Sequence, residues 1–214
     1  MDEILESLKK AIIEYDTEAA ASWAKKAVEE GIDPIKALDA LTEGIKQVGD
    51  GYGRGELWLP DLVGAASAMT SATPIIEEKI KATGGKRQKL GTIVIGTVYG
   101  DIHNIGKNMV SSLALAQGFE VIDLGVDVAA EKFIDAVTKH EPQILALSSL
   151  LTTSASVQKE IIEALKKANL REKVKIAMGG GAITPEFAET IGADGYKPTA
   201  IGAIDLFKEF VGVK

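Results

Sequence analysis

The residues best suited to chemistry lie in one short polar segment, residues 99–108. It contains His103, one of two histidines in the chain, with Asp101 two residues before it and Gly106 three residues after it. A histidine paired with a carboxylate can bind a metal through one ring nitrogen while the other nitrogen donates a hydrogen bond to the carboxylate. The segment therefore allows two interpretations: a metal-binding histidine, or an ordinary loop histidine beside an aspartate that caps the following helix.

Common phosphate and zinc sites fit this segment poorly. The glycines after the preceding apolar run lack the Gly-x-Gly-x-x-Gly spacing of a dinucleotide site. Gly106 and Lys107 resemble the end of a P-loop, but the earlier glycine is one position out of place, and Asn108 stands where a magnesium-binding Ser or Thr is required. A zinc site needs three or four ligands, whereas the chain has no cysteine and His140 is expected to end a later helix. The remaining metal-binding interpretation is that His103 is a single axial ligand to a metal whose other ligands belong to a cofactor.

The elements around this segment predict an α/β fold. An apolar run at 92–98 is typical of a buried parallel strand, and open α/β sheets bind ligands at the carboxyl ends of their strands. Beyond residue 90 the strand and helix patterns alternate, which predicts a Rossmann-like, doubly wound five-stranded parallel sheet. Strands are expected near 91–98, 120–124, 143–149, 174–178 and 194–196, and helices near 105–117, 130–140, 154–168, 185–191 and 199–211.

The first 84 residues predict a four-helix bundle. The first helix covers 3–14, and the second follows a cap at Asp16 or Thr17 and stops at Gly31. The third starts at Asp33-Pro34 and is expected to be broken by the glycines at 49, 51, 53 and 55, whereas the fourth starts at 59–61 and continues past a kink at Pro74. The expected domains are a helical-bundle cap at 1–84, a linker at 85–90 with a hinge at 83–89, and a binding domain at 91–214.

Composition and charge narrow the classes of partner. Hydrophobic residues make up 46% of the 214 residues and charged residues 26%, which is ordinary for a globular protein. The net charge of −7 lies entirely in residues 1–84, while residues 85–214 are neutral. An acidic bundle without a basic face argues against nucleic acid and anionic membranes as partners, and most of it is expected to be a solvated helical surface. The absence of a long apolar run, a secretory segment and cysteine predicts a cytoplasmic protein without disulfides.

The pattern Asp-x-His-x-x-Gly at 101–106 resembles the cobalamin-binding module of methionine synthase and of the corrinoid proteins of methylamine, methanol and methoxyaryl metabolism. The resemblance implies a cobalamin or related corrinoid in the base-off, His-on form, with His103 ligating cobalt in place of the cofactor's own lower base. It further implies that Asn104, Ile105 and Gly106 border the cofactor, and that the displaced nucleotide tail lies in a slot between strands.

A second match follows the third expected strand, where hydroxyl side chains gather at 148–154. Without the resemblance, Ser154 is the N-cap of the next helix. With it, the stretch is similar to the family's Ser-x-Leu segment. Ser148 and Thr152 would then bond to the buried tail, Leu150 would line its slot, and Ser154 would complete a relay from His103 through Asp101. The hydroxyl would hold the carboxylate ionised, and the relay could take up a proton when the histidine leaves cobalt.

Further matches lie at the end of the fourth expected strand and near the fifth. Three glycines at 179–181 can form a tight turn; the resemblance implies that Gly180 and Gly181, or Gly179 in another register, let the nucleotide base lie against bare backbone. The resemblance also places Tyr196 and the backbone as far as Ala200 beside the base.

The segment at 52–62 is similar to the family's cap, in which aromatic and leucine side chains cover the upper face of cobalt. Tyr52, Trp58, Leu59 and Leu62 match, although tryptophan replaces phenylalanine at position 58. An aromatic staple that closes the bundle is the alternative interpretation.

Taken together, these residues resemble those of a methyl-carrying corrinoid protein. The resemblance implies that a substrate-specific methyltransferase places a methyl group on Co(I), and that a second methyltransferase passes it to coenzyme M or tetrahydrofolate. A reductive activase would be a further partner, and the chain would be a carrier subunit instead of a complete enzyme. The methyl donor, with methylated amines favoured by overall likeness, the acceptor, the native lower base and the oligomeric state stay open.

Three other functions remain as alternatives. A cobalamin-dependent sensor would add a basic DNA-binding module ahead of the cap, and a mutase subunit would lack the helical cap. In an α/β binding protein that does not bind cobalamin, the motif would be a coincidence.

Overall fold

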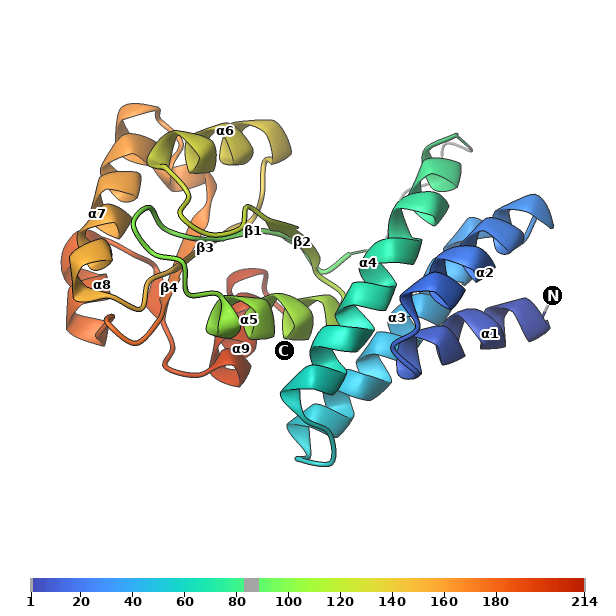
Figure 1. The fold of residues 1–214 in the computed structure, drawn as a ribbon. Coiled ribbons are helices and arrows are strands. Elements are labelled where there is room, and N and C mark those ends of the chain that lie inside the picture. Colours follow the sequence, from blue (N-terminus) through green and yellow to red (C-terminus); the bar gives the residue numbers. More distant parts are fainter. Residues whose placement is uncertain (1, 83–88, 214) are drawn as a thin grey trace. The chain divides into compact units, whose positions relative to one another are not determined.

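The computed structural model describes residues 2–82 and 89–213 (Figure 1). The chain divides into two compact units, Met1–Lys89 with Leu115–Gly118, and Leu90–Ala114 with Phe119–Lys214. The expected fold class is confirmed: four helices precede a five-stranded parallel sheet with helices. The predicted hinge falls mainly on residues 83–88, which lie outside the described residues.

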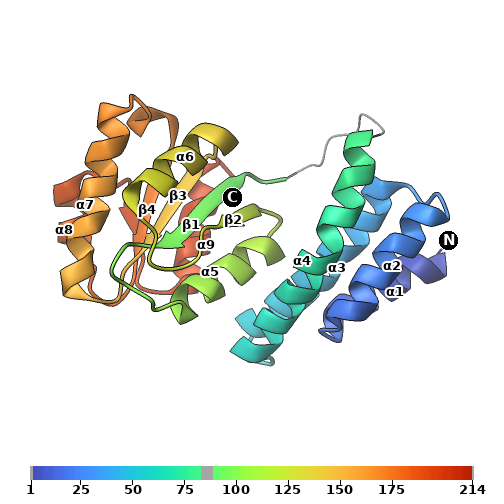
Figure 2. The ribbon, with the colours of Figure 1, turned by 45° about the horizontal axis from the view of Figure 1, so that its top comes forward.

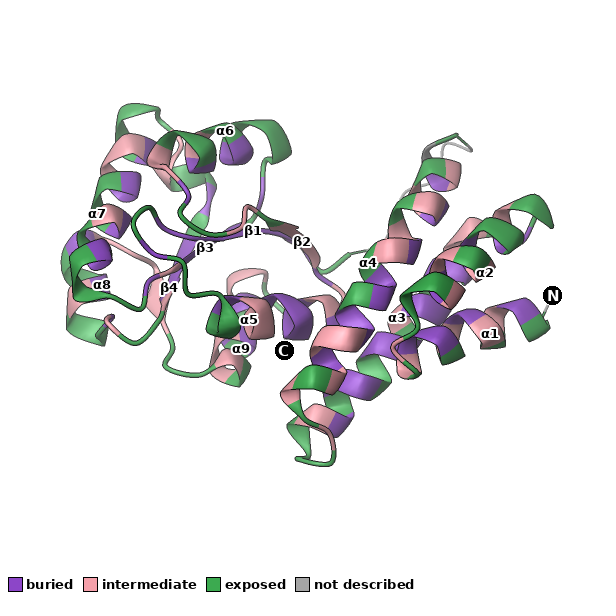
Figure 3. Cartoon of the chain, in the orientation of Figure 1, coloured by how far each residue is buried: buried purple, intermediate pink, exposed green. Residues whose placement is uncertain are grey.

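The first unit contains four amphipathic helices whose apolar sides face one another. Leu8, Ile12, Leu41 and Ile45 are completely buried, and Figure 3 shows buried and exposed positions alternating along each helix. Asp16, not Thr17, caps the second helix by accepting a hydrogen bond from the Ala19 N–H at 2.8 Å. The helices are α1 (Asp2–Ile13), α2 (Thr17–Glu29), α3 (Pro34–Gly53) and α4 (Leu59–Ala82).

The expectation that glycines 49 and 51 break α3 is wrong, because the helix continues to Gly53. Glycine costs about 1 kcal/mol relative to alanine inside a helix, but here it permits close packing. A Cβ at Gly44 would lie 2.9 Å from the backbone oxygen of Lys9, and one at Gly51 would lie 2.9 Å from Leu57 Cδ1. Packing against neighbours therefore offsets the weak helix propensity. Helix α4 continues through Pro74, as expected.

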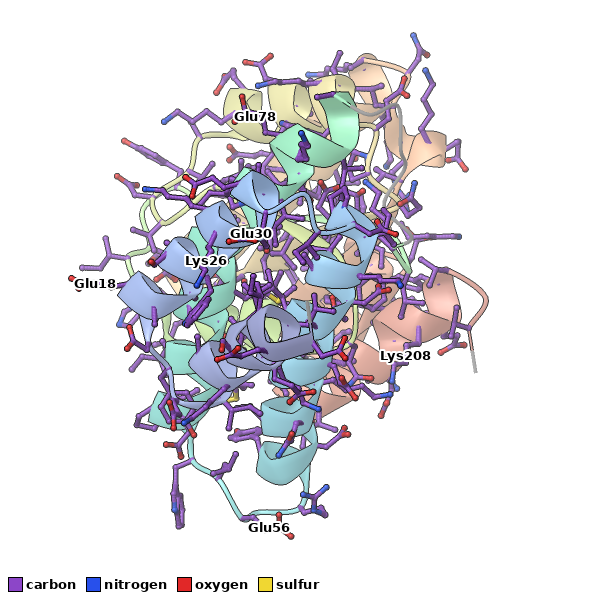
Figure 4. The ribbon with its side chains drawn as sticks, turned by 90° about the vertical axis from the view of Figure 1, so that its right-hand side faces the viewer. Glu18, Lys26, Glu30, Glu56, Glu78 and Lys208 are labelled. Carbon is purple, nitrogen blue, oxygen red and sulfur yellow. The ribbon has the colours of Figure 1, made fainter. Side chains whose placement is uncertain are left out.

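Acidic side chains lie on the outside of the bundle. Glu18, Glu30, Glu56 and Glu78 are exposed, and Figure 4 shows them spread over different parts of the helical unit. Their separation agrees with the expected solvated helical surface.

The second unit contains the parallel sheet in the order β2-β1-β3-β4-β5. Figures 1 and 2 show α6 and α7 on one face of the sheet and α5 and α9 on the other. Strand β1 pairs with β2 on one side and with β3 on the other, so the chain order of the strands reverses at β1. The loops after β1 and β3 therefore lie next to each other at the carboxyl edge of the sheet, where sheets of this kind bind ligands. The elements are β1 (Thr92–Thr97), α5 (Ile105–Ala116), β2 (Glu120–Asp123), α6 (Ala130–His140), β3 (Ile144–Ser148), α7 (Thr152–Lys167), a 3-10 turn (Arg171–Lys173), β4 (Lys175–Gly179), α8 (Pro185–Ile191), β5 (Gly195–Tyr196) and α9 (Ala200–Phe210).

The core of this unit lies between the sheet and helices α6, α7 and α8. Val94, Leu145 and Ile176 project from three adjacent strands into a cluster that includes Phe133 of α6 and Ile161 of α7. These near-continuous apolar strands match the sequence pattern of a sheet covered on both faces.

Candidate functional site

His103 follows β1 in a loop that holds its ring by one nitrogen. Its Nδ1 lies 2.7 Å from Oδ1 of Asp101, and its side chain remains 49% exposed. When Nδ1 carries the proton and donates it to the carboxylate, Nε2 has a free lone pair. The arrangement therefore presents Nε2 as a single metal ligand.

Asp101 is buried behind the histidine and accepts five hydrogen bonds. Oδ1 accepts the backbone N–H and the ring N–H of His103, whereas Oδ2 accepts the N–H groups of Leu150 and Leu151 at 2.7 and 3.1 Å and the hydroxyl of Ser154 at 3.0 Å. Burial raises the pKa of the Asp101 carboxyl, but these donors outweigh burial and hold the pKa well below its usual range. The carboxylate is therefore ionised and fixed in orientation.

The hydrogen-bond chain extends one residue beyond Ser154. The Ser149 and Ser154 hydroxyl oxygens are 2.7 Å apart, and both residues are buried. An ionised Asp101 can only accept, so in the contact between them Ser154 is the donor, and a Ser154 that donates there can accept from Ser149. The Leu151 carbonyl is a second acceptor within reach of both hydroxyls, at 3.1 Å from Ser149 and 3.0 Å from Ser154. Ser149 was not among the expected site residues, because within the run of hydroxyl residues nothing distinguishes it from its neighbours.

Local hydrogen bonds explain why the loop reaches this geometry. Gly100 has φ +80°, a conformation that glycine adopts without strain. The buried Thr97 hydroxyl donates to the His103 carbonyl at 2.9 Å, and the Val98 N–H donates to the Ser148 carbonyl at 3.1 Å. The loop is thereby tied to both β1 and β3.

Beside the histidine, a cavity of about 940 Å³ lies between the sheet, α5 and α9. Its floor contains a row of three residues in register on adjacent strands, Ile95, Ala146 and Ala177, and the register continues to Gly195 on β5. Because these residues are mostly small, the sheet leaves space that large side chains would fill. This floor and its far wall on α9 were not expected, since single alanines in a strand do not indicate a cavity until the strand register aligns them.

Most residues expected to border a ligand do line this cavity. They are His103, Asn104, Ile105, Gly106, Ser148, Leu150, Gly180, Gly181 and Tyr196. Thr152 does not line it and is exposed in the first turn of α7. The interpretation of Ser154 as an N-cap is wrong: α7 begins at Thr152, and its N-cap position is Leu151. The Ser154 hydroxyl is thus free to bond to Asp101.

Gly180 allows two loops to pack closely, a role that the sequence did not indicate. Its φ is +112°, and a Cβ there would lie 1.9 Å from the carbonyl oxygen of Ser149. The absence of a side chain lets the loops after β3 and β4 interlock. A Cβ on Gly181 would lie 2.9 Å from Leu150 Cδ1, whereas one on Gly179 would meet nothing within 4 Å.

Lys107, in the first turn of α5, also lines the cavity and was not expected as a site residue. Its side chain is almost completely buried and its Nζ donates to Asp123 and to Asn108. Since Asp123 ends β2, this ion pair ties the start of the helix that follows His103 to the edge of the sheet.

The four predicted cap residues lie in the helical unit, around the start of α4. Leu62 is completely buried in the bundle, Tyr52 and Leu59 are partly buried, and Trp58 is 75% exposed. Asp61 fixes this turn by accepting the Trp58 N–H at 2.7 Å. Trp58 is thus the cap candidate with the most surface available for a contact.

The donor set limits which metals can bind. Within residues 2–82 and 89–213, no group of three or more His, Cys, Asp or Glu side chains could hold a metal ion. A metal bound by His103 must therefore bring its remaining ligands with it. Among the helices described, none is long and apolar enough to cross a membrane.

Comparisons with known proteins agree with this geometry. Two family models, each described as a B12 binding domain, match residues 91–205 and 4–77. The chain is 40% identical to trimethylamine corrinoid protein 2 of Methanosarcina mazei over 97% of this chain and 95% of that protein. It is 41% identical to a corrinoid protein of Desulfitobacterium hafniense over 98% of both chains. The structure is similar to a chain of the methanol:cobalamin methyltransferase complex of Methanosarcina barkeri, with a TM-score of 0.84 and 32% identity over all of this chain and 81% of that chain.

Proposed function

Because this chain belongs to the methyltransferase corrinoid protein family, we propose that it carries a methyl group on a bound corrinoid between two methyltransferases. The observation that supports the proposal most directly is the pairing of a half-exposed His103 with a buried, fully hydrogen-bonded Asp101. A bound corrinoid would supply a cobalt ion able to take up a methyl group and give it to an acceptor.

The residues fit such a group in two respects. A corrinoid would bring most of its metal's ligands with it, so the protein would need to add only one nitrogen, and Nε2 of His103 would provide it. The cavity beside His103, with its floor of small residues, can hold the nucleotide tail that a histidine ligand displaces. Its volume of about 940 Å³ lies within the range of small-molecule sites.

Within this function each residue of the relay has a distinct task. His103 ligates cobalt through Nε2, Asp101 keeps the proton on Nδ1, and Ser154 holds Asp101 in place. Ser148, Leu150 and Tyr196 contact the tail, and Gly181 leaves room for its base. In the helical unit the cap role falls to the exposed Trp58 and the partly buried Tyr52 and Leu59, whereas Leu62 is completely buried in the bundle.

The proposed partners follow from the two transfers. A substrate-specific methyltransferase delivers the methyl group, and a second one passes it to coenzyme M or tetrahydrofolate. A reductive activase restores oxidised cobalt. We propose methylated amines as the donor class, since trimethylamine corrinoid proteins are 38–40% identical to this chain.

The histidine ligand can be tested by reconstituting the protein with hydroxocobalamin and removing free cofactor by gel filtration. Wild type is expected to give a base-off, His-on spectrum, and His103→Ala is expected to lose it. His140→Ala, which changes the exposed histidine at the end of α6, is the matched control and should retain the wild-type spectrum. A wild-type spectrum from His103→Ala would refute the ligand assignment.

The carrier role is tested by capture of partners from an extract of the source cells on the reconstituted protein, followed by assay of the captured methyltransferases with methylated amines. The expected result is methylation of reduced wild-type protein and none of His103→Ala. Methylation of both proteins at the same rate would show that the His103 site does not carry the methyl group.

A further inference from the structure

Asp127, in the loop between β2 and α6, has a left-handed backbone conformation, which few residues other than glycine adopt. Its φ is +54°, in the left-handed region, and its side chain is exposed. Most non-glycine residues are strained there, although Asn and Asp tolerate it better than others. An exposed residue in this conformation needs local contacts to hold it.

Those contacts go to the two residues that lead into the histidine loop. The Gly100 N–H donates to Oδ1 of Asp127 at 2.8 Å, and the Asp127 N–H donates to the carbonyl oxygen of Asp101 at 2.9 Å. Asp127 therefore binds the Gly100–Asp101 segment from both sides, once as acceptor and once as donor.

The loop that carries Asp127 is itself anchored on the end of β1. The next residue, Val128, is buried, forms a bridge with Val98 and donates its N–H to the Thr97 carbonyl at 3.0 Å. The Thr97 N–H in turn donates to the Gly125 carbonyl at 3.0 Å. Asp127 thus links the end of β1 to the backbone of Asp101 and holds that backbone in place relative to the sheet.

The backbone of Asp101 determines where its carboxylate meets the His103 ring. Both groups share Oδ1, which accepts from the His103 N–H and from Nδ1, so a rotation or shift at Asp101 would move the ring with it. We propose that Asp127 is a positioning residue for the axial histidine, because it clamps the Gly100–Asp101 segment in the orientation that aims Nε2 at the bound metal. This inference rests on the proposed function, in which His103 ligates cobalt.

Three substitutions separate the side-chain acceptor from the backbone conformation. Asp127→Asn keeps an oxygen acceptor and tolerates the left-handed region, and should behave like wild type. Asp127→Gly keeps the conformation but removes the acceptor, and Asp127→Ala removes the acceptor and adds strain. The matched control is Glu141→Ala, since Glu141 is also acidic, exposed and left-handed with φ +43°, but lies at the end of α6 and binds no part of the histidine loop.

The experiment uses full-length protein loaded with cobalamin and reduced to Co(II). It measures the nitrogen superhyperfine splitting of the axial ligand by electron paramagnetic resonance, the Kd for cobalamin, and the melting temperature of the cofactor-free protein. The protein's histidine nitrogens are isotopically labelled, so that their splitting differs from that of the cofactor's own unlabelled base. Asp127→Ala and Asp127→Gly are expected to raise the Kd about tenfold and to reduce the fraction with the histidine-nitrogen signal. Asp127→Asn should stay within about twofold of wild type, as should Glu141→Ala even if its melting temperature falls.

Wild-type affinity and signal in Asp127→Gly would overturn the inference. It would also be overturned if Asp127→Asn lost as much as Asp127→Ala, or if Glu141→Ala showed the same loss. Absence of nitrogen splitting in wild type itself would instead refute the proposed function, so the two failures are distinguishable.

Discussion

The two faces of the sheet are formed by the same strands, yet one is filled along its length, whereas the other is hollow at the carboxyl edge, where the cavity lies. Toward α6 and α7, Val94, Leu145 and Ile176 pack with Phe133 and neighbours into a continuous core. Toward α5 and α9, the residues next to them in sequence, Ile95, Ala146 and Ala177, form the floor of the cavity. In β3 and β4 large and small residues alternate, so the large side chains stabilise one face while the small ones leave space for a ligand on the other.

The sharpest way to test this comparison is at adjacent positions of β3. Leu145→Ala removes a completely buried side chain from the filled face and should destabilise the second unit by about 2–5 kcal/mol. Denaturant unfolding measures this loss, and the Kd for cobalamin should stay within about twofold of wild type at temperatures where the variant is folded. A much larger rise in Kd would show that the two faces are not independent.

The opposite substitution tests the hollow face. Ala146→Leu places a larger side chain in the cavity, so it should leave the free energy of unfolding nearly unchanged but raise the Kd for cobalamin at least tenfold, about 1.4 kcal/mol. Titration with cobalamin followed by absorbance measures the affinity. An unchanged Kd would place the nucleotide tail elsewhere.

Asp101 is expected to affect stability less than Leu145 does, and with a defined pH dependence. Its pKa is lowered on folding, so it stabilises the fold above the unfolded-state value near 4, and this contribution is lost as the pH falls below that value. Asp101→Asn should destabilise the cofactor-free protein by about 1–3 kcal/mol at pH 7. The difference from wild type should narrow when unfolding is repeated near pH 3, and a constant difference would contradict the assigned cause.

Thr152 should give the smallest effect, since it lies on neither face. Thr152→Ala is expected to change stability by less than about 0.5 kcal/mol and to leave the Kd for cobalamin within about twofold of wild type. Ser148→Ala, at a position that does line the cavity, is the comparison and should weaken binding more. A loss at Thr152 equal to that at Ser148 would support the sequence-based expectation that both bond to the tail.

The sequence predicted those features that depend on local pattern. Helix α6 and helix α8 have the expected bounds, because apolar periodicity and end signals lie within each segment. The residues of the relay were implied by the family resemblance of the Asp-x-His-x-x-Gly motif and the Ser-x-Leu segment, and the structure joins His103, Asp101 and Ser154 by hydrogen bonds. These residues carry chemistry that few other arrangements explain.

Features that depend on register or on backbone conformation could not be predicted. Ala146 and Ala177 become a cavity floor only when β3 and β4 pair. Asp127 is one acidic loop residue among many until its hydrogen bonds to Gly100 and Asp101 are seen. In α3, the low helix propensity of glycine predicted a break, whereas the packing of these glycines against neighbouring residues allows the helix to continue.

The close packing at Gly180 limits which amino-acid substitutions the protein can accept at this position during evolution. Any coding change at that codon adds at least a Cβ, which meets the fixed backbone of Ser149 instead of a side chain that could turn away. A library randomised at this position and selected only for folding should therefore return glycine almost alone, even in the absence of any cofactor. Invariance there would record a steric requirement of the scaffold, and should not be taken as a mark of ligand contact.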